Sequence, residues 1–367
     1  MKEKELLYLL ALQKVKGIGT INAKKLIAHL GSAEAVFTTK KSVLQSINGI
    51  GSSTLQDLDN TETLQKAEKE LRYIIDQKVQ YSSFFDSSYP ERLKHSIDGP
   101  LLLFSEGHIH FEEQPVISIV GTRNMTSYGL RFLEQLIEDI APYNPIIVSG
   151  FAYGVDITAH KMALKNKLQT IAVLAHGLDH MYPKSHKKYV HQVLENGGFY
   201  TEHWHEEPAL REHFLQRNRI VAGLAEAVII VESAERGGSL VTASIANSYN
   251  RDVFAVPGRV TDTYSQGCNN LIRTNKAALL HSAKDLVYLL NWEKKKQKTK
   301  IIQPQLFVDL QGDDKIIYDY LSKKGKTLLD TISLDCKIPI YKISGVLVNL
   351  ELQGLIRPLP GKLFEII

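Results

Sequence analysis

Glycine-containing segments at three places in the middle of the chain are the residues best suited to bind an anion. They are Gly121-Thr122-Arg123, Ser149-Gly150-Phe151 and Gly237-Gly238-Ser239, the last followed by Thr242. Glycine lets backbone N–H groups face an anion, and the N-terminus of a following helix adds partial positive charge. Taken singly, each segment is also an ordinary connection between a strand and a helix. Together they predict a site for an extended polyanion or a nucleotide.

Basic side chains could complete this site. Arg123 offers two parallel donors to phosphate oxygens, and Lys184 follows Tyr182 and Pro183. The run Arg217-Asn218-Arg219 lies in a helical pattern. Because its two arginines are two residues apart, they cannot share one helix face. We expect one of them to face the ligand and the other to pair with an acid such as Glu232, and the sequence leaves open which does which.

The residues that a nucleotide enzyme needs are absent from these segments. The chain has neither Gly-x-Gly-x-x-Gly nor Gly-x-x-x-x-Gly-Lys-Ser/Thr, so dinucleotide binding and ATP hydrolysis lose their main support. The strongest enzymatic alternative is a lysine-decarboxylase-like (nucleoside-monophosphate phosphoribohydrolase) enzyme, which uses a glutamate three residues after the threonine of a Gly-Gly-x-x-Thr turn. Here Thr242 is followed by Ala243, Ser244 and Ile245. We therefore predict a binding protein with no catalytic residues and no cofactor.

Two further alternatives rest on titratable side chains. Asp156 and His160 are four residues apart on one predicted helix, where they could act as acid and base or serve as a cap and a structural contact. A metal site could use the histidines at positions 176, 180, 186, 191, 203, 205 and 213. Without carboxylate partners at a fixed ligand spacing, the sequence favours exposed or hydrogen-bonded histidines and no metal site.

Short apolar runs alternate with helical patterns from Val116 onward. The predicted strands are Val116–Val120, Ile146–Ser149, Thr170–Ala175, Gly198–Thr201, Ala227–Val231 and Asp252–Val256. The predicted helices are Tyr128–Ile140, Val155–Asn166, His186–Asn196, Phe214–Gly223 and Ser239–Tyr249. This alternation indicates an α/β fold with a Rossmann-like, doubly wound, mostly parallel sheet. Ligands of such folds bind outside the carboxyl ends of the strands, which is where the glycine segments would lie.

A helical domain is predicted for residues 1–80. Within it, Gly17-Ile18-Gly19 and Gly49-Ile50-Gly51 each separate two helical patterns. This arrangement is typical of helix-hairpin-helix (SAM-like) domains, whose turns either grip a DNA backbone or merely connect helices. The Rossmann-like domain is expected to cover residues 81–291.

The end of the chain is predicted to form a separate domain. The charged residues 292–306 are typical of a linker. In residues 307–367, three helical patterns precede a hairpin around Pro360-Gly361, which is the order of a winged helix. The helical patterns are Asp314–Lys323, Thr327–Cys336 and Tyr341–Gln353. Lys342 is the only basic residue of the third helical pattern, so a protein contact or a packing role is favoured over DNA binding.

Composition agrees with a cytoplasmic protein. The 367-residue chain carries a net charge of +4, which permits phosphate binding without predicting it. Cys268 and Cys336 are far apart and indicate neither a disulfide framework nor a zinc site. The apolar stretch near the N-terminus is too short and interrupted to span a bilayer, so no membrane association is expected.

An ordered series of short motifs resembles the DNA-processing protein A (DprA/Smf) family. The series runs from Tyr89-Pro90-Glu91-Arg92-Leu93 to Gly267-Cys268-Asn269-Asn270 and includes the glycine segments, Tyr182-Pro183-Lys184 and Arg217-Asn218-Arg219. It covers about residues 85–280, and the flanking domains match the architecture of many members. Two departures could reshape the edge of the site. Leu215 stands where the family usually has proline, and Ala175-His176-Gly177 replaces a more common Gly-x-Gly.

The resemblance implies a homodimeric bacterial protein that binds single-stranded DNA taken up in natural transformation and helps to load a RecA-type recombinase. It also implies that Arg123 and Lys184 lie in the DNA pocket. We expect phosphates of one strand to bind the backbone N–H groups of residues 121–123, 149–151 and 237–239, with little sequence preference. The candidates for base stacking are Phe151, Tyr153 and Tyr182.

Overall fold

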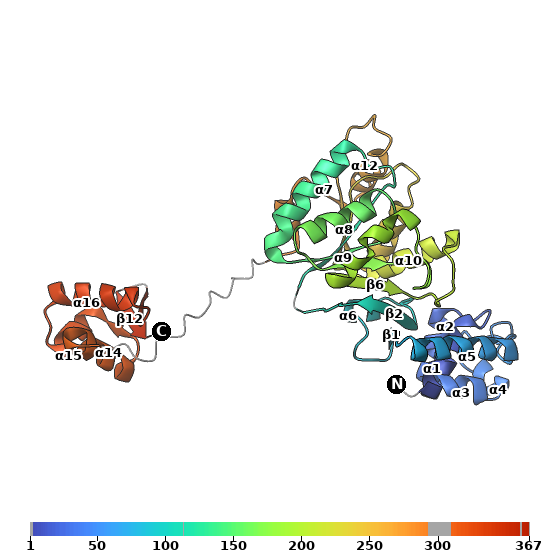
Figure 1. The fold of residues 1–367 in the computed structure, drawn as a ribbon, viewed down its shortest axis with the longest axis horizontal. Coiled ribbons are helices and arrows are strands. Elements are labelled where there is room, and N and C mark those ends of the chain that lie inside the picture. Colours follow the sequence, from blue (N-terminus) through green and yellow to red (C-terminus); the bar gives the residue numbers. More distant parts are fainter. Residues whose placement is uncertain (1–2, 113, 293–309, 360–361, 367) are drawn as a thin grey trace. The chain divides into compact units, whose positions relative to one another are not determined.

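The computed structural model describes residues 3–112, 114–292, 310–359 and 362–366. They belong to two compact units, residues 1–294 and residues 295–367 (Figure 1). Residues 293–306 of the predicted linker lie outside the described residues. Within the described ranges, no helix has both the length and the apolar character that crossing a membrane would require.

One large sheet organises the first unit. In the described part of the chain it has nine strands in the order β1-β2-β6-β5-β4-β3-β7-β8-β9. The strands β1 (Gln80–Ser83) and β2 (Leu102–Gly107) form an antiparallel edge against β6. The remaining pairs are parallel, between β3 Val116–Val120, β4 Ile146–Ser149, β5 Thr170–Val173, β6 Gly197–Thr201, β7 Ala227–Ile230, β8 Asp252–Ala255 and β9 Ala278–Leu279. The predicted doubly wound, mostly parallel sheet is therefore confirmed.

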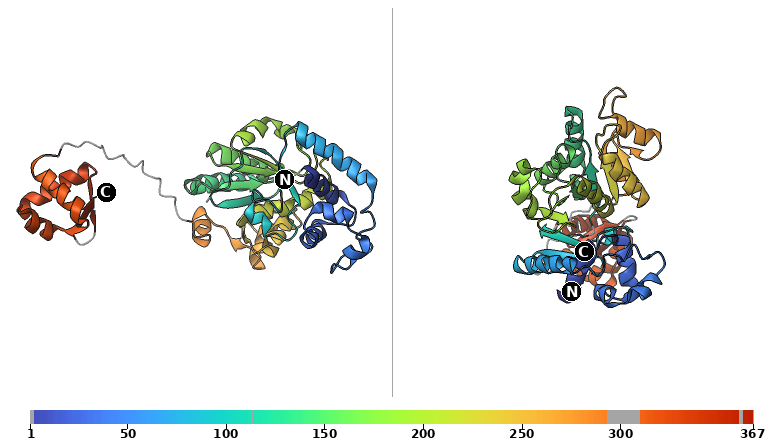
Figure 2. Two further views of the ribbon diagram at one scale, coloured as in Figure 1. Left: turned by 90° about the horizontal axis from the view of Figure 1, so that it is seen from below. Right: turned by 90° about the vertical axis from the view of Figure 1, so that its right-hand side faces the viewer.

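Helices cover both faces of this sheet. Their bounds are α6 Glu91–Lys94, α7 Ser127–Ile140, η1 Ala141–Tyr143, α8 Val155–Lys165, η2 Lys184–Tyr189, α9 Val190–Glu195, α10 Arg211–Leu224, α11 Ser239–Ser248, α12 Gln266–Arg273 and α13 Ala283–Leu289. Figure 2 shows helices on both sides of the sheet. In β3, Ile117 and Ile119 pack with α7 and α8, whereas Val116 and Val120 pack with α10 and α11. Alternate residues of a strand point to opposite faces, so a continuous apolar run is buried on both sides.

The N-terminal helices share a core with the antiparallel edge of the sheet. They are α1 Glu3–Lys14, α2 Thr20–Leu30, α3 Ala33–Thr38, α4 Lys41–Gln45 and α5 Thr61–Asp76. Leu102, Phe104 and Trp204 belong to the same apolar cluster as the buried face of α1. The helical region is therefore continuous in packing with the α/β sheet.

The two glycine turns of this region differ. Gly17 adopts a φ of +88° and leads through Gly19 into α2, as predicted. After Gly49, residues 52–58 form successive turns instead of the predicted helix. Their hydrogen bonds span three residues, as from Leu55 N–H to Ser52 O, because Ser52, Ser53 and Thr54 favour turns over a helix interior.

The second unit has the element order of a winged helix, as predicted. Its elements are α14 Gly312–Lys324, β10 Thr327–Leu328, α15 Leu329–Cys336, α16 Ile340–Leu352, β11 Ile356–Leu359 and β12 Leu363–Ile366. Thr327 and Leu328 pair with β12 and do not begin the second helix, which the sequence predicted from Thr327. The predicted turn at Pro360-Gly361 lies outside the described residues.

Candidate nucleic-acid interface

A cleft of about 810 Å³ opens at the carboxyl ends of β3, β4 and β7. The chain leaves β3 for β4 on one side, and β7 pairs with β3 on the other, so the cleft lies where the strand order reverses. This switch point is the usual ligand position in doubly wound folds. Most of the predicted site residues line the cleft: Gly121, Thr122, Arg123, Gly150, Arg217, Asn218, Gly237, Gly238, Ser239 and Thr242.

Two predicted residues are instead buried in the core. Ser149 is fully buried and its hydroxyl donates to Ile119 O at 2.6 Å. Phe151 is 1% exposed and packs edge-on against Phe199. Neither side chain contacts the cleft, so the expectation that Phe151 stacks on bases is wrong.

Arg217 and Arg219 have separate environments, and the one that pairs with an acid is Arg219. Arg217 is buried beneath the cleft, and its Nη1 donates to Gly150 O and Val173 O, both at 2.5 Å. Arg219 lies outside the cleft lining and pairs with Glu202.

Glu232, the partner suggested by the sequence, binds neither arginine. Its carboxylate accepts from the Thr126 N–H at 2.8 Å and from the Thr126 hydroxyl at 2.5 Å. The Thr126 hydroxyl in turn caps α7 by accepting from the N–H groups of Tyr128 and Gly129. These bonds engage the N–H groups of Thr126, Tyr128 and Gly129, and the Glu232 carboxylate places a negative charge at the N-terminus of α7, which disfavours binding of a second anion there.

The backbone donors proposed for phosphate binding are only partly available. Thr122 N–H donates to Glu232 O at 2.7 Å, and Gly237 N–H donates to Ala234 O at 3.0 Å. By contrast, α11 has no side-chain cap, and the N–H groups of Gly238 and Ser239 have no acceptor within the described ranges. The start of α11 is thus the anion-receptive helix terminus of this cleft.

The cleft also contains residues that sequence reasoning did not select. Arg211 and Phe214 line it from the same face of α10 as the predicted Asn218, at the spacing i, i+3 and i+7. The predicted helix began at Phe214, so Arg211 was left outside the pattern that would have identified it. Arg236 also lines the cleft, on the loop that leads to α11. Arg211 and Arg236, like Arg123, are exposed.

Two aromatic side chains lie at the cleft. Tyr182 is 43% exposed, and its ring meets Phe214 edge-on with centres 5.5 Å apart. His176, at a position that departs from the family pattern, supports Tyr182 because its Nε2 accepts from the Tyr182 N–H at 3.3 Å. Lys184, two residues further along the chain, is exposed but is not part of the cleft lining. Tyr153 is 45% exposed and also lies outside that lining.

Asp156 and His160 make separate contacts, and the cleft lining includes Asp156 but not His160. Asp156 lies under the cleft beside Arg217; burial raises the pKa of this carboxyl, and the arginine opposes the rise. His160 is fully buried, with Nδ1 2.7 Å from the Thr170 hydroxyl. Burial lowers the pKa of His160 to about 3, so its ring is neutral and away from the cleft.

The balance of charge in the cleft favours an anion. Among the described residues that line it, Asp156 is the one acid, whereas Arg123, Arg211, Arg217 and Arg236 are cations. No carboxylate follows Thr242 along α11 before the helix ends, so the nucleotide-hydrolase alternative lacks its acid at that place in the structure as well. The fold and the cleft together define a doubly wound α/β protein with a cleft lined mainly by cations and a C-terminal winged helix.

Comparison with known proteins identifies the family. The sequence model of the family "DNA recombination-mediator protein A" matches residues 80–291, and that of the DprA winged helix domain matches residues 305–362. The chain belongs to the DNA recombination-mediator protein A family, as the sequence motifs predicted.

Individual relatives agree with this assignment. The chain is 38% identical over 211 residues to the DNA processing protein DprA of Streptococcus pneumoniae, covering 58% of this chain and 74% of that protein. The crystal structure of the Streptococcus pneumoniae protein matches with a TM-score of 0.66 at 30% identity, over 80% of this chain and 99% of that one. A structure concerned with the single-stranded DNA binding mode of the Helicobacter pylori protein matches with a TM-score of 0.53 at 28% identity, over 58% of this chain and 98% of that one.

Proposed function

We propose that the protein binds single-stranded DNA in the cleft at the switch point and delivers it to a RecA-type recombinase. The observation that carries the DNA site is the set of exposed arginines Arg123, Arg211 and Arg236 around a cleft whose single described acid is countered by Arg217. Charges arranged in this way bind a phosphate backbone without reading sequence. The similarity to the Helicobacter pylori protein supports the choice of single strands.

In the proposed site, both backbone N–H groups and side chains bind the DNA. One phosphate binds at the Gly238 and Ser239 N–H groups, and neighbouring phosphates bind Arg123 and Arg211. The exposed face of Tyr182 stacks on a base, which is the sequence-tolerant contact of single-strand binders. Lys184 extends the basic surface beyond the cleft. We propose no catalytic step, and the nucleotide-hydrolase alternative is disfavoured because α11 has no carboxylate after Thr242.

The partners follow from family membership. A recombination mediator acts on DNA together with a recombinase, so we place the protein in the cytoplasm and expect it to act as a homodimer. The winged helix and the N-terminal helices are proposed to add contacts to protein or DNA without forming the primary site. The proposals on partners, location and oligomeric state rest on family membership, whereas the proposed DNA site rests on the residues that line the cleft.

A fluorescence-anisotropy titration tests the DNA site. Labelled single-stranded and double-stranded oligonucleotides of equal length are compared at two salt concentrations. The proposal expects tighter binding of the single strand and a clear loss of affinity at the higher salt concentration. A preference for duplex, or no binding, would reject it. The recombinase step is tested separately by a pull-down with the cognate recombinase, with and without DNA, and no interaction in either case would reject the delivery role alone.

A further inference from the structure

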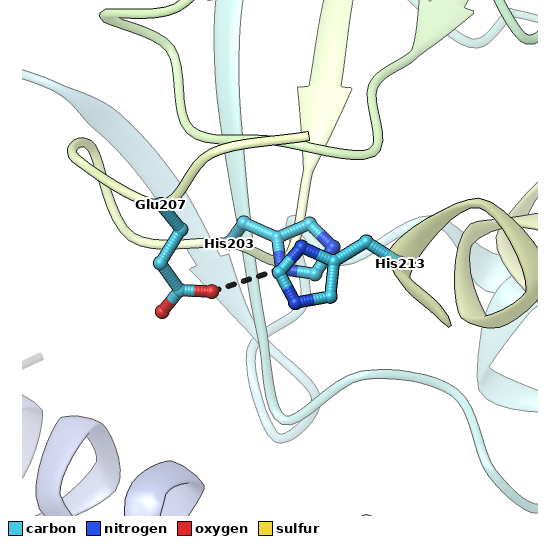
Figure 3. Close-up of side chains that lie close together, drawn as sticks. All are labelled: His203, Glu207 and His213. Carbon is cyan, nitrogen blue, oxygen red and sulfur yellow. Dashed lines mark hydrogen bonds and ion pairs between the residues drawn. The ribbon is translucent and has the colours of Figure 1, made fainter. Parts of the chain in front are cut away.

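Three side chains of metal-ligating type meet near the cleft: His203, Glu207 and His213 (Figure 3). One donor atom of each lies within 4.8 Å of the donor atoms of the other two. His203 and Glu207 belong to the loop after β6, and His213 lies in the first turn of α10. The next residue of α10, Phe214, lines the cleft. A ligand at this cluster would therefore act on the cleft wall.

The hydrogen bonds of His213 leave a nitrogen free to bind a metal. Its Nδ1 lies 3.1 Å from Pro208 O. A carbonyl oxygen can only accept, so Nδ1 carries the hydrogen and the neutral ring has its lone pair on Nε2. Metal-binding histidines are usually oriented by such a bond from the other ring nitrogen.

His203 is the buried member of the cluster. Its side chain is 5% exposed, and its ring stacks on that of His213 with centres 4.0 Å apart. Nδ1 lies 3.0 Å from Glu207 Oε2, while Nε2 has no hydrogen-bond partner in the part of the chain that the structure describes. The contacts within the protein therefore do not satisfy this buried ring.

Other histidines considered from the sequence are engaged elsewhere. The Nδ1 of His176 lies 2.8 Å from Gly177 O, the Nε2 of His180 lies 2.8 Å from Glu206 O, and His205 binds the buried Glu70. No carboxylate at ligand spacing was recognised from the sequence, although Glu207 follows His203 by four residues. The spacing of His203 and Glu207 indicates a metal site only once the fold is known, because the fold places His213 of α10 beside them.

We propose that His203, Glu207 and His213 bind one divalent transition-metal ion of the zinc class, with water completing the coordination. Two imidazoles and one carboxylate are a donor set that zinc accepts, and in a tetrahedral site the donor atoms are about 3.3 Å apart. The donor atoms of the cluster are at most 4.8 Å apart, so each pair must come closer by no more than about 1.5 Å when the ion binds. The bound ion would fasten the loop after β6 to the first turn of α10.

Lys14 lies beside Glu207 and is expected to weaken metal binding, which provides a specific test of the site. Its ammonium group pairs with Glu207 Oε1, the oxygen that does not face His203. A positive charge at this position repels a divalent cation and weakens its binding. Removing the charge should therefore strengthen metal binding, whereas removing a ligand should weaken it.

The experiment uses the full chain after treatment with a chelator. Co²⁺ is titrated while visible absorption is recorded, and Zn²⁺ is titrated by calorimetry. We expect one ion per chain, a Co²⁺ spectrum typical of a four-coordinate site, and a thermal midpoint that rises with Zn²⁺. His213→Gln should weaken Zn²⁺ binding at least about tenfold and abolish the rise. Lys14→Gln should tighten it.

A matched control is available in α9. His191 lies 3.3 Å from Glu195 at the same four-residue spacing, but this pair is exposed and does not belong to the three-residue cluster. His191→Gln should leave Zn²⁺ binding unchanged. If His213→Gln proves unstable without metal, Glu207→Gln serves in its place because it keeps the shape of the side chain. Absence of Zn²⁺ and Co²⁺ binding, or binding that neither ligand variant weakens, would overturn the site.

Discussion

The guanidinium carbon of Arg123 lies 5.3 Å from the centre of the Phe214 ring. This contact joins the loop after β3 to α10 across the cleft. Attraction between a cation and an aromatic face contributes about 0.5–1 kcal/mol at exposed sites. Because it restricts Arg123, the contact holds one positive charge in position before DNA arrives and reduces the entropy that binding must otherwise lose.

Arg123→Ala is expected to weaken single-stranded DNA binding by about 1–3 kcal/mol, or roughly 5- to 150-fold. The reason is the removal of a charge-assisted hydrogen bond to phosphate. The slope of log affinity against log salt concentration should become shallower by about 0.7 for each phosphate that the variant no longer neutralises. Anisotropy titrations at several salt concentrations measure both quantities. Arg131→Ala, an exposed position on α7 outside the cleft lining, is the control, and equal effects of the two variants would contradict the site.

Gly238→Ala tests the start of α11. A Cβ at Gly238 would meet no atom within 4 Å, and the φ of −61° suits alanine. Stability should therefore stay constant or rise slightly, because alanine restricts the unfolded chain. The added methyl group would nonetheless occupy the space through which a phosphate reaches the free N–H groups, so we expect a several-fold loss of DNA affinity. Unchanged affinity would indicate that the start of α11 does not bind DNA.

Gly121→Ala is the comparison that separates folding from binding. A Cβ at Gly121 would lie 2.6 Å from Val155 Cγ2 and 2.9 Å from Glu232 O. Because Glu232 O is backbone, the strand or its neighbour must shift, at a cost of about 1–3 kcal/mol in the free energy of unfolding. Thermal denaturation should show a lowered midpoint for Gly121→Ala and no such decrease for Gly238→Ala. A similar decrease in both thermal midpoints would show that any loss of DNA affinity in Gly238→Ala comes from impaired folding.

Arg219→Ala should reduce stability and leave DNA affinity unchanged. Arg219 and Glu202 are each 13% exposed in their side chains, and removing one partner of a buried ion pair costs about 3–5 kcal/mol. The double variant Arg219→Met/Glu202→Leu should recover most of this stability, because no unpaired charge remains. Urea unfolding of the single and double variants measures the recovery. Weaker DNA binding by the folded double variant would indicate that Arg219 does contribute to DNA binding.

The elements of the α/β sheet could be predicted because each strand is a short apolar run between glycine or polar residues. β1, β2 and β9 were not predicted. β1 reads Gln-Tyr-Ser-Ser and has no apolar run, β9 has two residues, and β2 contains Leu-Leu-Phe but lies outside the alternation of strands and helices that begins at Val116. In the candidate site, residue type and spacing identified Arg123 and the glycine at 238. They could not show that Ser149 and Phe151 turn into the core, or that Glu232 already occupies the N-terminus of α7, since both depend on contacts between distant segments.

Lys24 gives a pH-dependent stability that can be measured without DNA. It lies on α2 with its Nζ 3.5 Å from the centre of the Phe84 ring and 3.3 Å from Ile97 O. Burial, and then the charge of Arg219, lower the pKa of Lys24 to about 8, against the attraction of Asp98. Between this value and the usual pKa of about 10.4, the unfolded chain holds a proton that the folded chain has released. Stability from this group therefore rises as pH increases from about 8, and it is lowest when Lys24 is protonated in both states.

Lys24→Met should remove this contribution. The variant is expected to gain most relative to the parent protein at pH 7, where the parent must bury a charge, and the gain should shrink by pH 9.5. Thermal midpoints of both proteins at pH 7, 8.5 and 9.5 measure the difference. Lys165→Met, at an exposed position on α8, should show no such trend. A difference between Lys24→Met and the parent that stays constant with pH would mean that Lys24 keeps its proton in the folded protein, and that the contact with the Phe84 ring stabilises the charged form enough to offset burial.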